Sequence, residues 1–385
     1  MPDTDVAVIG AGPAGAWAAW RLARGGAKVT ILDPSHPREK PCGGGLTGRA
    51  AALVQPAVTL AALPHVSVGV ARFEYEARRA AVALPWRSGP PALVIASRRE
   101  LDGALLAAAC QAGATHLARR VRDVRRSGDG WALMTNEGPI TSRWLIGADG
   151  PTSLVRRRIA TPFARTDLSI ATGYFVRGVS SPDITIAFDD PTAGYLWSFP
   201  RPDHLAVGVC AQADRSTASA LLNVAREWIA RAIPDAPPLD RYAWPIPSLT
   251  EAALERERPA GPGWMLTGDA AGLVDPITRE GIYFALRSAD LAADSLLSER
   301  DPTACYEEAV RDDIYVELRR AAQLKARFFR PAFIALLMRA LQSSARIRDV
   351  MADLIAGEQQ YRGLRRRLIS TFELRLMIEV FTTRS

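Results

Sequence analysis

A glycine-rich turn near the start of the chain has the composition and spacing of a phosphate-binding loop. An apolar run over residues 6–9 leads into Gly10, Gly12 and Gly15, which are spaced G-x-G-x-x-G. Little side-chain bulk surrounds such a turn, so the first backbone N–H groups of a following helix, expected over residues 13–24, can meet a diphosphate. Because a helix N-terminus carries a partial positive charge, the turn predicts binding of an anionic nucleotide.

The next segment supplies the acidic residue that such a motif needs. Gly25 and Gly26 can end the helix, and a second apolar strand over residues 28–32 leads to Asp33. A carboxylate at this separation is typical of one that accepts a hydrogen bond from a ribose hydroxyl. Strand, turn, helix, strand and acid occur in the right order, which favours a dinucleotide-binding unit over glycines that serve packing alone.

A second candidate loop runs through Cys42, Gly43, Gly44 and Gly45. Three consecutive glycines allow a backbone to approach a flat ligand closely, although the same composition also suits a flexible surface turn. Cys42 is the most suggestive cysteine of the chain because of these glycine neighbours.

Three further stretches bring a charged residue to the end of a strand or the start of a helix. Arg98 stands at the start of a helical pattern, and Asp149 follows a buried-looking strand between small residues. Gly268 and Asp269 follow a short apolar strand, and another helix begins near Gly281. Each arrangement can direct a charge or a helix N-terminus at one ligand.

A second sheet is expected from the alternating strands over residues 169–211. Tyr195, Trp197 and Phe199 fall on one face of one of these strands. Strand aromatics usually belong to a core, but such a face can also line an apolar pocket. A proline-rich connection over residues 234–247 is expected to lead back towards the first unit.

Composition limits the classes of function. At 385 residues, two or three packed units are expected. The net charge of +7 favours anionic partners, but no nucleic-acid-binding signature accompanies it, so no nucleic-acid partner is expected. The cysteines form no C-x-x-C pair and the histidines do not cluster, so neither a metal site nor a disulfide framework is expected. Cys110 and Cys210 are expected in the core.

The two ends of the chain bear on its location. The first strand begins close to Met1, and no apolar run approaches the roughly 20 residues that span a bilayer, so a cytoplasmic protein is expected. Near the other end, Leu364, Leu368, Phe372 and Leu376 repeat every four residues among arginines. Such helices either pack on the core or lie on an anionic membrane surface as a peripheral membrane element, and both interpretations stay open.

Taken together, these stretches resemble flavoproteins of the p-hydroxybenzoate hydroxylase fold, and most closely the geranylgeranyl reductase family. The family resemblance rests on K-P-C-G-G-G-L over residues 40–46, Y-x-W-x-F-P over residues 195–200 and E-G-I-Y over residues 280–283. Aromatic monooxygenases of this fold usually carry His at the position of Gly272 and Gln at that of Glu280, and this chain has neither.

The resemblance implies an α/β fold with three parts. These are a Rossmann-like FAD-binding domain of the p-hydroxybenzoate hydroxylase and glutathione reductase type, an antiparallel-sheet substrate domain and a helical C-terminal region. The expected boundaries are residues 1–70, 96–165 and 255–300 for the FAD-binding domain, 71–95 and 166–254 for the substrate-binding domain, and 301–385 for the helical region.

The resemblance also implies the residues that form the site. Those that would bind FAD are Gly10, Gly12, Ala14, Gly15, Asp33, Gly43, Gly44, Gly45, Arg98, Asp149, Gly268, Asp269, Gly281 and Ile282. Tyr195, Trp197 and Phe199 would form the wall of a substrate pocket. Cys42 would be the candidate proton donor, or else would have a structural role on the flavin face. Arg279 stands where the reductases usually carry Gly, which can narrow the pocket or add a contact to an anion.

The activity implied is that of an FAD-dependent oxidoreductase that reduces C=C bonds of a prenyl lipid or a related hydrophobic substrate, with NADPH or reduced ferredoxin as electron donor. The alternatives are an FAD-dependent monooxygenase acting on an aromatic or polyketide substrate, and a flavoprotein that only carries electrons. The Y-x-W-x-F-P run also resembles a halogenase motif, but halogenases need a lysine in mid-chain, and none lies between Lys40 and Lys325.

Overall fold

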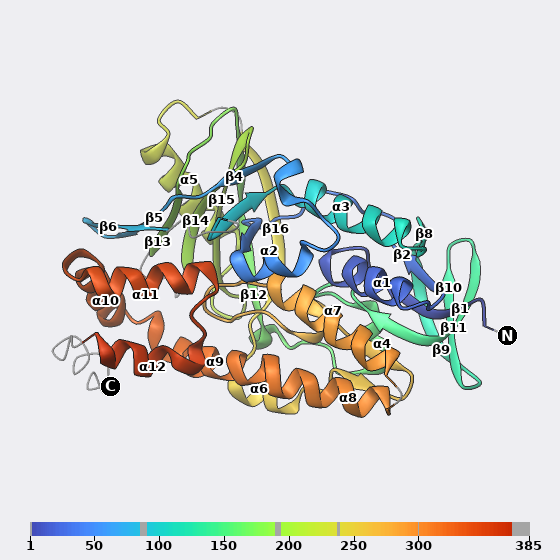
Figure 1. Cartoon of the computed structure of the whole chain (residues 1–385). Helices are drawn as coiled ribbons and strands as arrows, with labels where there is room; N and C mark the ends of the chain where they lie inside the picture. Colours follow the sequence, from blue (N-terminus) through green and yellow to red (C-terminus); the bar gives the residue numbers. More distant parts are fainter. Residues whose placement is uncertain (1, 85–90, 189–193, 237–238, 299, 372–385) are drawn as a thin grey trace.

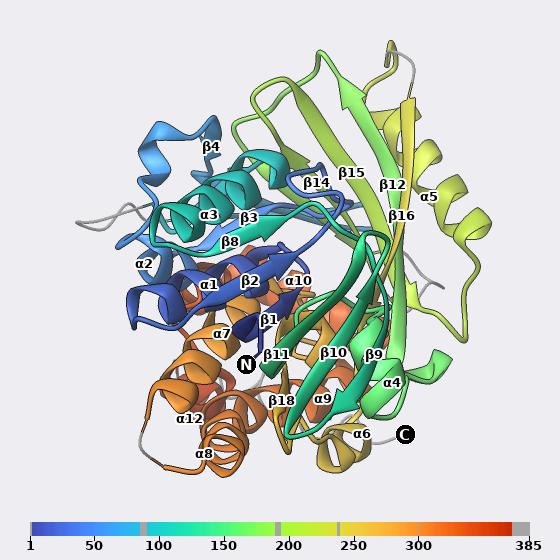
Figure 2. The ribbon, with the colours of Figure 1, turned by 90° about the vertical axis from the view of Figure 1, so that its right-hand side faces the viewer.

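The computed structural model describes residues 2–84, 91–188, 194–236, 239–298 and 300–371 of the chain. Two large sheets and a group of C-terminal helices are its main parts (Figure 1). In the view turned by 90°, the second sheet stands beside the blue and teal elements of the first (Figure 2).

The first sheet is built around β1 (Thr4–Ile9), which pairs in parallel with β2 (Val29–Leu32) on one side and with β11 (Gly138–Gly147) on the other. The strand order is β17-β18-β11-β1-β2-β8, and β10 and β9 extend the sheet from β11. The remaining strands are β8 (Thr115–Leu117), β9 (Val121–Ser127), β10 (Gly130–Thr135), β17 (Ala260–Gly261) and β18 (Trp264–Leu266). All four residues of β2 are buried, as is usual for a parallel strand covered on both faces.

Helices that pack on one another cover this sheet. α1 (Pro13–Arg24) packs against both α3 (Arg98–Gln111) and α7 (Ile282–Leu297). Between α1 and α7, Trp17 Nε1 donates a buried hydrogen bond of 2.7 Å to Asp290 Oδ1. The helix predicted over residues 13–24 is therefore confirmed, and α1 begins directly after the glycine turn.

The second sheet has the order β16-β12-β15-β14-β13-β5-β6, with antiparallel neighbours except for the parallel pair β13 and β5. Its strands are β5 (Val70–Tyr75), β6 (Arg78–Ala83), β12 (Leu168–Arg177), β13 (Ile184–Phe188), β14 (Tyr195–Pro200), β15 (His204–Gln212) and β16 (Leu239–Pro247). α5 (Ala218–Ala232) packs on β12 and β15 and buries Leu221 and Trp228 there. The other face of the sheet turns towards the C-terminal helices.

The proline-rich connection expected over residues 234–247 is wrong in its second half, because residues 239–247 form β16. β16 pairs with β12 alone and is an edge of the sheet. Pro245 and Pro247 have no N–H group to donate, and an edge strand tolerates this since one side of its backbone needs no ladder partner.

A small three-stranded sheet connects the glycine run to the start of α3. β7 (Leu93–Ala96) is its central strand, between β3 (Gly45–Thr47) and β4 (His65–Ser67). From the sequence, residues 71–95 are expected in the substrate-binding domain. In the structure, β5 and β6 belong to the second sheet, whereas β7 belongs to this small sheet.

The C-terminal part of the chain is helical, and α10 and α11 pack on β5 and β6 (Figure 1). Its helices are α8 (Pro302–Ala309), a π segment η4 (Val310–Tyr315), α9 (Val316–Phe328), α10 (Pro331–Ser343), α11 (Ala345–Ala356) and α12 (Tyr361–Ser370). The short helices elsewhere are α2 (Gly48–Val54), η1 (Leu60–Ala62), α4 (Leu154–Ile159), η2 (Arg165–Asp167), α6 (Glu251–Arg256) and η3 (Gly268–Ala271).

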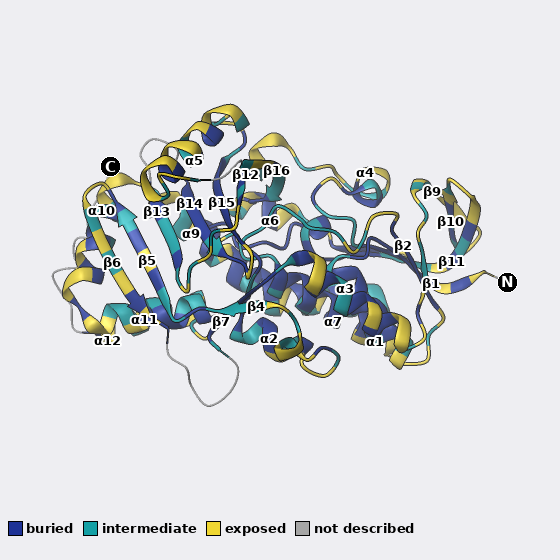
Figure 3. Cartoon of the chain, turned by 90° about the horizontal axis from the view of Figure 1, so that it is seen from above, coloured by how far each residue is buried: buried dark blue, intermediate teal, exposed yellow. Residues whose placement is uncertain are grey.

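Burial follows this architecture: the strands are dark where helices cover them, and exposed residues gather on the outer faces of α3 and α5 (Figure 3). The predicted α/β fold, with a Rossmann-like unit, an antiparallel sheet and a helical C-terminal region, is confirmed. Within the described ranges, every helix is too short or too polar to cross a bilayer.

Candidate cofactor and substrate site

A cavity of about 1300 Å³ lies between the two sheets and the C-terminal helices. The glycine turn after β1 and the start of α7 line one part of it, and β13, β14 and α9 to α12 line another. Backbone and charged groups dominate the first part, whereas apolar side chains dominate the second. A single cavity therefore joins groups suited to a nucleotide with groups suited to a hydrophobic molecule.

Most of the predicted FAD-binding residues line this cavity: Gly10, Gly12, Ala14, Asp33, Gly43, Gly44, Gly45, Arg98, Asp149, Asp269, Gly281 and Ile282. Gly15 and Gly268 do not line it. Gly15 serves packing instead, because a Cβ atom there would lie 1.9 Å from the carbonyl oxygen of Gly10. The contact of each of these residues with FAD remains a prediction.

The glycine turn has the form that a diphosphate needs. Gly10 has φ +102°, and a Cβ atom on it would lie 2.4 Å from the carbonyl oxygen of Ala148. Gly12 precedes α1 and offers no side chain to cap it, so the first N–H groups of the helix are left for another acceptor. α7 likewise begins after an uncapped glycine, Gly281, at the cavity wall. Two uncapped helix N-termini at one cavity fit an anionic dinucleotide such as FAD.

Asp33 stands at the end of β2, where the motif predicts it, but its carboxylate already has several donors. One oxygen accepts hydrogen bonds from the N–H of Ala11 at 3.0 Å and from His36 Nδ1 at 2.7 Å. The other accepts from the N–H and Oγ of Ser35 and from the N–H of His36. These bonds lower the pKa of Asp33 against the opposing effect of burial. The acid therefore organises its own loop as well as facing the cavity.

His36 was missed by the sequence analysis, yet it links Asp33 to a buried ion pair on α3. Its Nε2 lies 3.5 Å from Asp102 Oδ2, and the Asp102 carboxylate accepts two hydrogen bonds from Arg98, at 2.9 and 2.8 Å. Burial alone would lower the pKa of His36, but the carboxylates of Asp102 and Asp33 outweigh it and raise that pKa. Asp102 lies one helical turn after Arg98, a spacing typical of an ion pair on an exposed helix face. Here the pair is buried, which the spacing alone does not indicate.

The glycine run is packed, so the surface-turn interpretation is wrong. A Cβ atom on Gly43 would lie 2.7 Å from the Phe199 ring, and one on Gly44, at φ +71°, would lie 2.4 Å from Arg201. Arg201, which the sequence analysis missed, is fully buried and donates to the carbonyl oxygens of Gly43 and Cys42. The run therefore lets the loop lie close against β14 while its backbone lines the cavity.

Cys42 lies on the cavity wall between two arginines. Its Sγ accepts a hydrogen bond of 3.3 Å from the N–H of Gly44, and its carbonyl oxygen accepts one of 3.0 Å from Arg201. The side chain of Cys42 also interacts with the guanidinium group of Arg98. A thiol at the cavity wall can give a proton to a bound molecule.

Two of the predicted acids make contacts within the protein. The carboxylate of Asp149 caps α4, accepting from Ser153 Oγ at 2.5 Å and from the N–H of Leu154 at 2.6 Å. Asp269 pairs with Lys40 at 3.2 Å. Both still line the cavity, but the carboxylate of Asp149 is directed at its own helix.

The predicted aromatic face is present on β14 and faces the cavity. Tyr195, Trp197 and Phe199 all line it, and the Tyr195 hydroxyl donates to the carbonyl oxygen of Thr278 at 2.5 Å. The rings of Tyr195 and Trp197 meet edge to face with centroids 6.2 Å apart. Apolar residues of the C-terminal helices complete the walls: Phe328, Phe333, Leu337, Ile347, Val350, Met351, Leu354, Ile355, Leu364 and Leu368.

The apolar residues of α12 belong to this cavity. Leu364 and Leu368 line it, which accounts for the first half of the repeat observed in the sequence, whereas Phe372 and Leu376 lie outside the described residues. The expectation that Cys110 is buried is wrong, because it follows the buried Ala109 by one position and so lies about 100° further round the helix.

Comparison with known proteins shows the family of the chain. A family model described as "FAD binding domain" matches residues 3–296. A menaquinone reductase of Mycolicibacterium smegmatis is 32% identical over 324 residues, covering 76% of this chain and 76% of that protein. A digeranylgeranylglycerophospholipid reductase of Methanothrix thermoacetophila is 29% identical over 349 residues, covering 85% of this chain and 88% of the relative.

The fold also has a counterpart among solved structures. A geranylgeranyl bacteriochlorophyll reductase-like protein from Thermoplasma acidophilum superposes with a TM-score of 0.77 and 22% identity, covering 95% of this chain and 98% of the other. At this identity the likeness shows the fold alone.

Proposed function

Since the chain belongs to the FAD binding domain family, and within it to the geranylgeranyl reductase family of FAD-dependent oxidoreductases, we propose that it reduces C=C bonds of a prenyl lipid or a related hydrophobic substrate. Two relatives support the proposal by name, since one is a menaquinone reductase and the other a digeranylgeranylglycerophospholipid reductase.

The observation that carries the proposal is the continuity of the cavity. Its nucleotide part, at Gly12 and Gly281, opens directly into an apolar part walled by Trp197, Phe199 and Phe328. An isolated alkene has no polar group near the reacting carbons, so its position must be set by shape and by apolar contact. An apolar pocket against the cofactor region is the arrangement that such a substrate requires.

The residues of the chain have separate tasks in this reaction. The uncapped starts of α1 and α7 would hold FAD, which supplies hydride to the substrate when it is bound in its reduced form. The aromatic face of β14 orients the alkene and, with α9 to α12, excludes water from it. NADPH and reduced ferredoxin remain the two candidate electron donors.

We assign the proton that completes the reduction to Cys42. Hydride adds to one carbon of the double bond and a proton must reach the other, so a donor is needed at the cavity wall. Cys42 lines that wall, and its S–H bond breaks as the new C–H bond forms at the second carbon, which leaves a thiolate. Cys42→Ser should slow alkene reduction much more than flavin reduction. Equal slowing of both steps would instead indicate a structural role on the flavin face.

The alternative is a monooxygenase of the same fold acting on an aromatic or polyketide substrate. Glu280, where those enzymes usually carry Gln, lines the cavity, and its carboxylate accepts hydrogen bonds from Thr47 Oγ1 and from Arg49. The names of the relatives favour reduction.

An anaerobic experiment separates the two activities. The purified FAD-loaded protein is reduced with dithionite and then mixed with a geranylgeranyl compound. We expect flavin reoxidation without oxygen and a product heavier by two hydrogens. A flavin that stays reduced until air is admitted would contradict the proposal. Trp197→Ala should slow reoxidation while FAD occupancy is kept, and Tyr195→Phe, which retains the ring and removes only the hydroxyl, is the matched control.

A further inference from the structure

Two cationic side chains meet beside the cavity and share one hydroxyl group. Arg279 Nη1 donates to Ser248 Oγ at 2.7 Å, and Lys325 Nζ donates to the same oxygen at 2.6 Å. Arg279 lies in the loop before α7 and lines the cavity, whereas Lys325 comes from α9. Residues far apart in the sequence thus place a guanidinium and an ammonium group at one point.

The guanidinium group of Arg279 is incompletely bonded. Its Nη1 donates hydrogen bonds to Ser248 Oγ and to the carbonyl oxygen of Pro276. Nε and Nη2 are buried and have no hydrogen-bond partner among the described residues. A guanidinium group has five donors, and leaving buried donors unpaired is unfavourable unless a ligand supplies the acceptor.

Within the described part of the chain, the ammonium group of Lys325 hydrogen-bonds only to neutral groups. Its two acceptors are Ser248 Oγ and Gln212 Oε1, at 2.6 and 2.7 Å. Burial, followed by the positive charge of Arg279, lowers the pKa of Lys325 to about 7. The other ionisable groups that act on it are Cys210, Asp214 and Arg215.

No carboxylate of the described chain forms an ion pair with either cation. Asp275, four residues before Arg279, uses Oδ1 to accept hydrogen bonds from the N–H groups of Ile277 and Thr278. Glu280 is paired with Arg49. Two adjacent, partly buried positive charges repel each other, and no described residue forms an ion pair that would offset this, so an anionic ligand would stabilise them.

We propose that Arg279 and Lys325 form a binding site for an anionic head group, a carboxylate or a phosphate, of the molecule whose apolar body occupies the cavity. The proposal rests on the proposed function and narrows its substrate class from any prenyl compound to an acidic one. Arg279 supplies planar paired donors and Lys325 a point charge, a combination suited to an oxyanion. A neutral head group can accept hydrogen bonds from these donors but leaves both positive charges without a counter-charge.

Arg279 itself is held in a backbone conformation that favours glycine. Its φ is +60°, and a non-glycine residue is destabilised in that region. Because glycine adopts this region without strain, replacing Arg279 with glycine removes the cation while suiting the backbone. This makes Arg279→Gly a variant that should fold, and the loss of anion binding in it would not be a loss of structure.

The test measures binding to the oxidised FAD-loaded protein and needs no turnover. Geranylgeranyl phosphate, geranylgeranic acid and geranylgeraniol share one chain and differ in head group, and each is titrated by the change in flavin absorbance. We expect the two acids to bind about tenfold to hundredfold more tightly than the alcohol, as expected for a charge-assisted hydrogen bond. Arg279→Gly and Lys325→Met should reduce that preference to about threefold or less and leave alcohol binding within about twofold.

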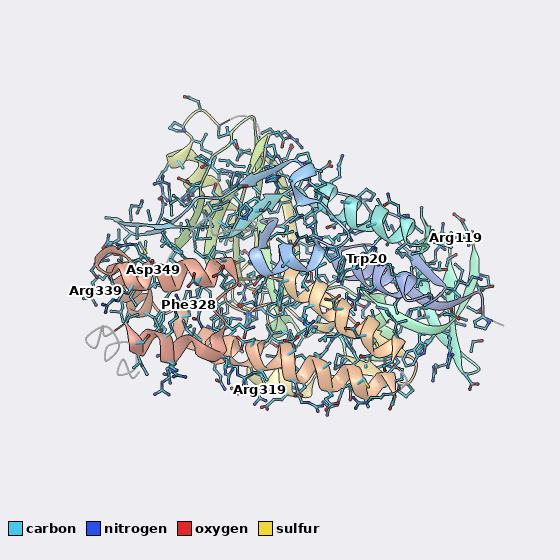
Figure 4. All side chains as sticks on the ribbon, viewed as in Figure 1. Trp20, Arg119, Arg319, Phe328, Arg339 and Asp349 are labelled. Atoms are coloured by element: carbon cyan, nitrogen blue, oxygen red, sulfur yellow. The ribbon has the colours of Figure 1, made fainter. Side chains whose placement is uncertain are left out.

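The matched control is Arg319→Gln. Arg319 is also on α9 but on the outer surface, where it pairs with Glu251 and Glu255 (Figure 4). This variant should keep the full preference for acids. Inorganic phosphate is titrated as well, to distinguish a free ion from a head group.

Three results would overturn the proposal. The first is an unchanged preference for acids in both cavity variants. The second is binding of inorganic phosphate that depends on Arg279 while the prenyl acids show no gain over the alcohol. The third is loss of FAD from Arg279→Gly, which would place the cation at the cofactor. If the acids bind as expected but no alkene is reduced, the head-group site stands and the proposed function fails.

Discussion

Arg201, at the end of β14, donates hydrogen bonds from its buried guanidinium group to the loop carbonyl oxygens of Cys42 and Gly43. The contact ties the second sheet to the loop that lines the nucleotide part of the cavity. The side chain of Arg201 has no exposed surface. It occupies the space that a side chain on Gly44 would need.

Arg201→Met should destabilise the protein by about 2–4 kcal/mol, because two buried carbonyl oxygens lose their donors. Urea denaturation of the FAD-free protein measures this directly. Arg177→Gln is the control on the same sheet, since Arg177 makes only an exposed pair with Asp240, and a change within about 0.5 kcal/mol is expected. Similar losses in the two variants would show that the loop contact contributes little.

Gly10→Ala should abolish FAD binding. Gly10 has a positive φ and also leaves no room for a Cβ atom. Gly113 has a positive φ of +107°, but nothing lies within 4 Å of a Cβ atom there. Gly113→Ala therefore isolates the backbone strain, which we expect at about 1–2 kcal/mol without loss of flavin. Flavin absorbance of the purified variants gives the answer. Equal loss of flavin in both variants would show that backbone strain, rather than the contact with Ala148, prevents FAD binding.

The stability of the protein should fall as the pH rises through the folded pKa of His36. That pKa is raised above the usual value of about 6.5, so protonated His36 contributes stability that is fully present below pH 6.5 and is lost above it. The free energy of unfolding of His36→Gln should lack this fall. His65→Gln, on the small sheet, should retain the slope of the wild type. A wild-type slope that survives in His36→Gln would assign the titration to another group.

Binding of a prenyl acid should weaken above pH 7, because only the protonated form of Lys325 attracts an anion and its pKa is about 7. The expected fall is at most tenfold per pH unit. Geranylgeranic acid is the suitable probe, since a carboxylate stays ionised throughout this range, whereas a monophosphate titrates within it. Lys325→Met should bind the acid with an affinity that is flat in pH. A wild-type affinity that is itself flat would show that Lys325 does not meet the head group.

Local motifs were predictable, and contacts between distant segments were not. The turn from Gly10 to Gly15 and the acid at Asp33 follow from spacing, because strand, turn and helix are adjacent in the chain. The environment of Arg201 could not be predicted, since its partners lie more than 150 residues away. The approach of Lys325 to Arg279 could not be predicted either, because it depends on how α9 packs beside the loop before α7.

Composition was also misleading where the position of a residue in the fold determines its environment. Pro245 suggested a connection, but its position on an edge strand makes proline acceptable. Cys110 falls in an apolar stretch, yet the rotation of α3 exposes it. The burial of Asp102 depends on which elements cover α3, and no sequence spacing contains that information.

The cavity draws its two kinds of wall from separate parts of the chain. The groups suited to the nucleotide come from the ends of β1 and β2 and the start of α7, whereas the apolar lining comes from β13, β14 and α9 to α12. Mutations in the C-terminal helices can therefore change the length or bulk of the accepted hydrophobic tail without altering the nucleotide part of the cavity. Tail selectivity and flavin chemistry can diverge independently among descendants of such a protein, so relatives that share its reaction need not share its substrate.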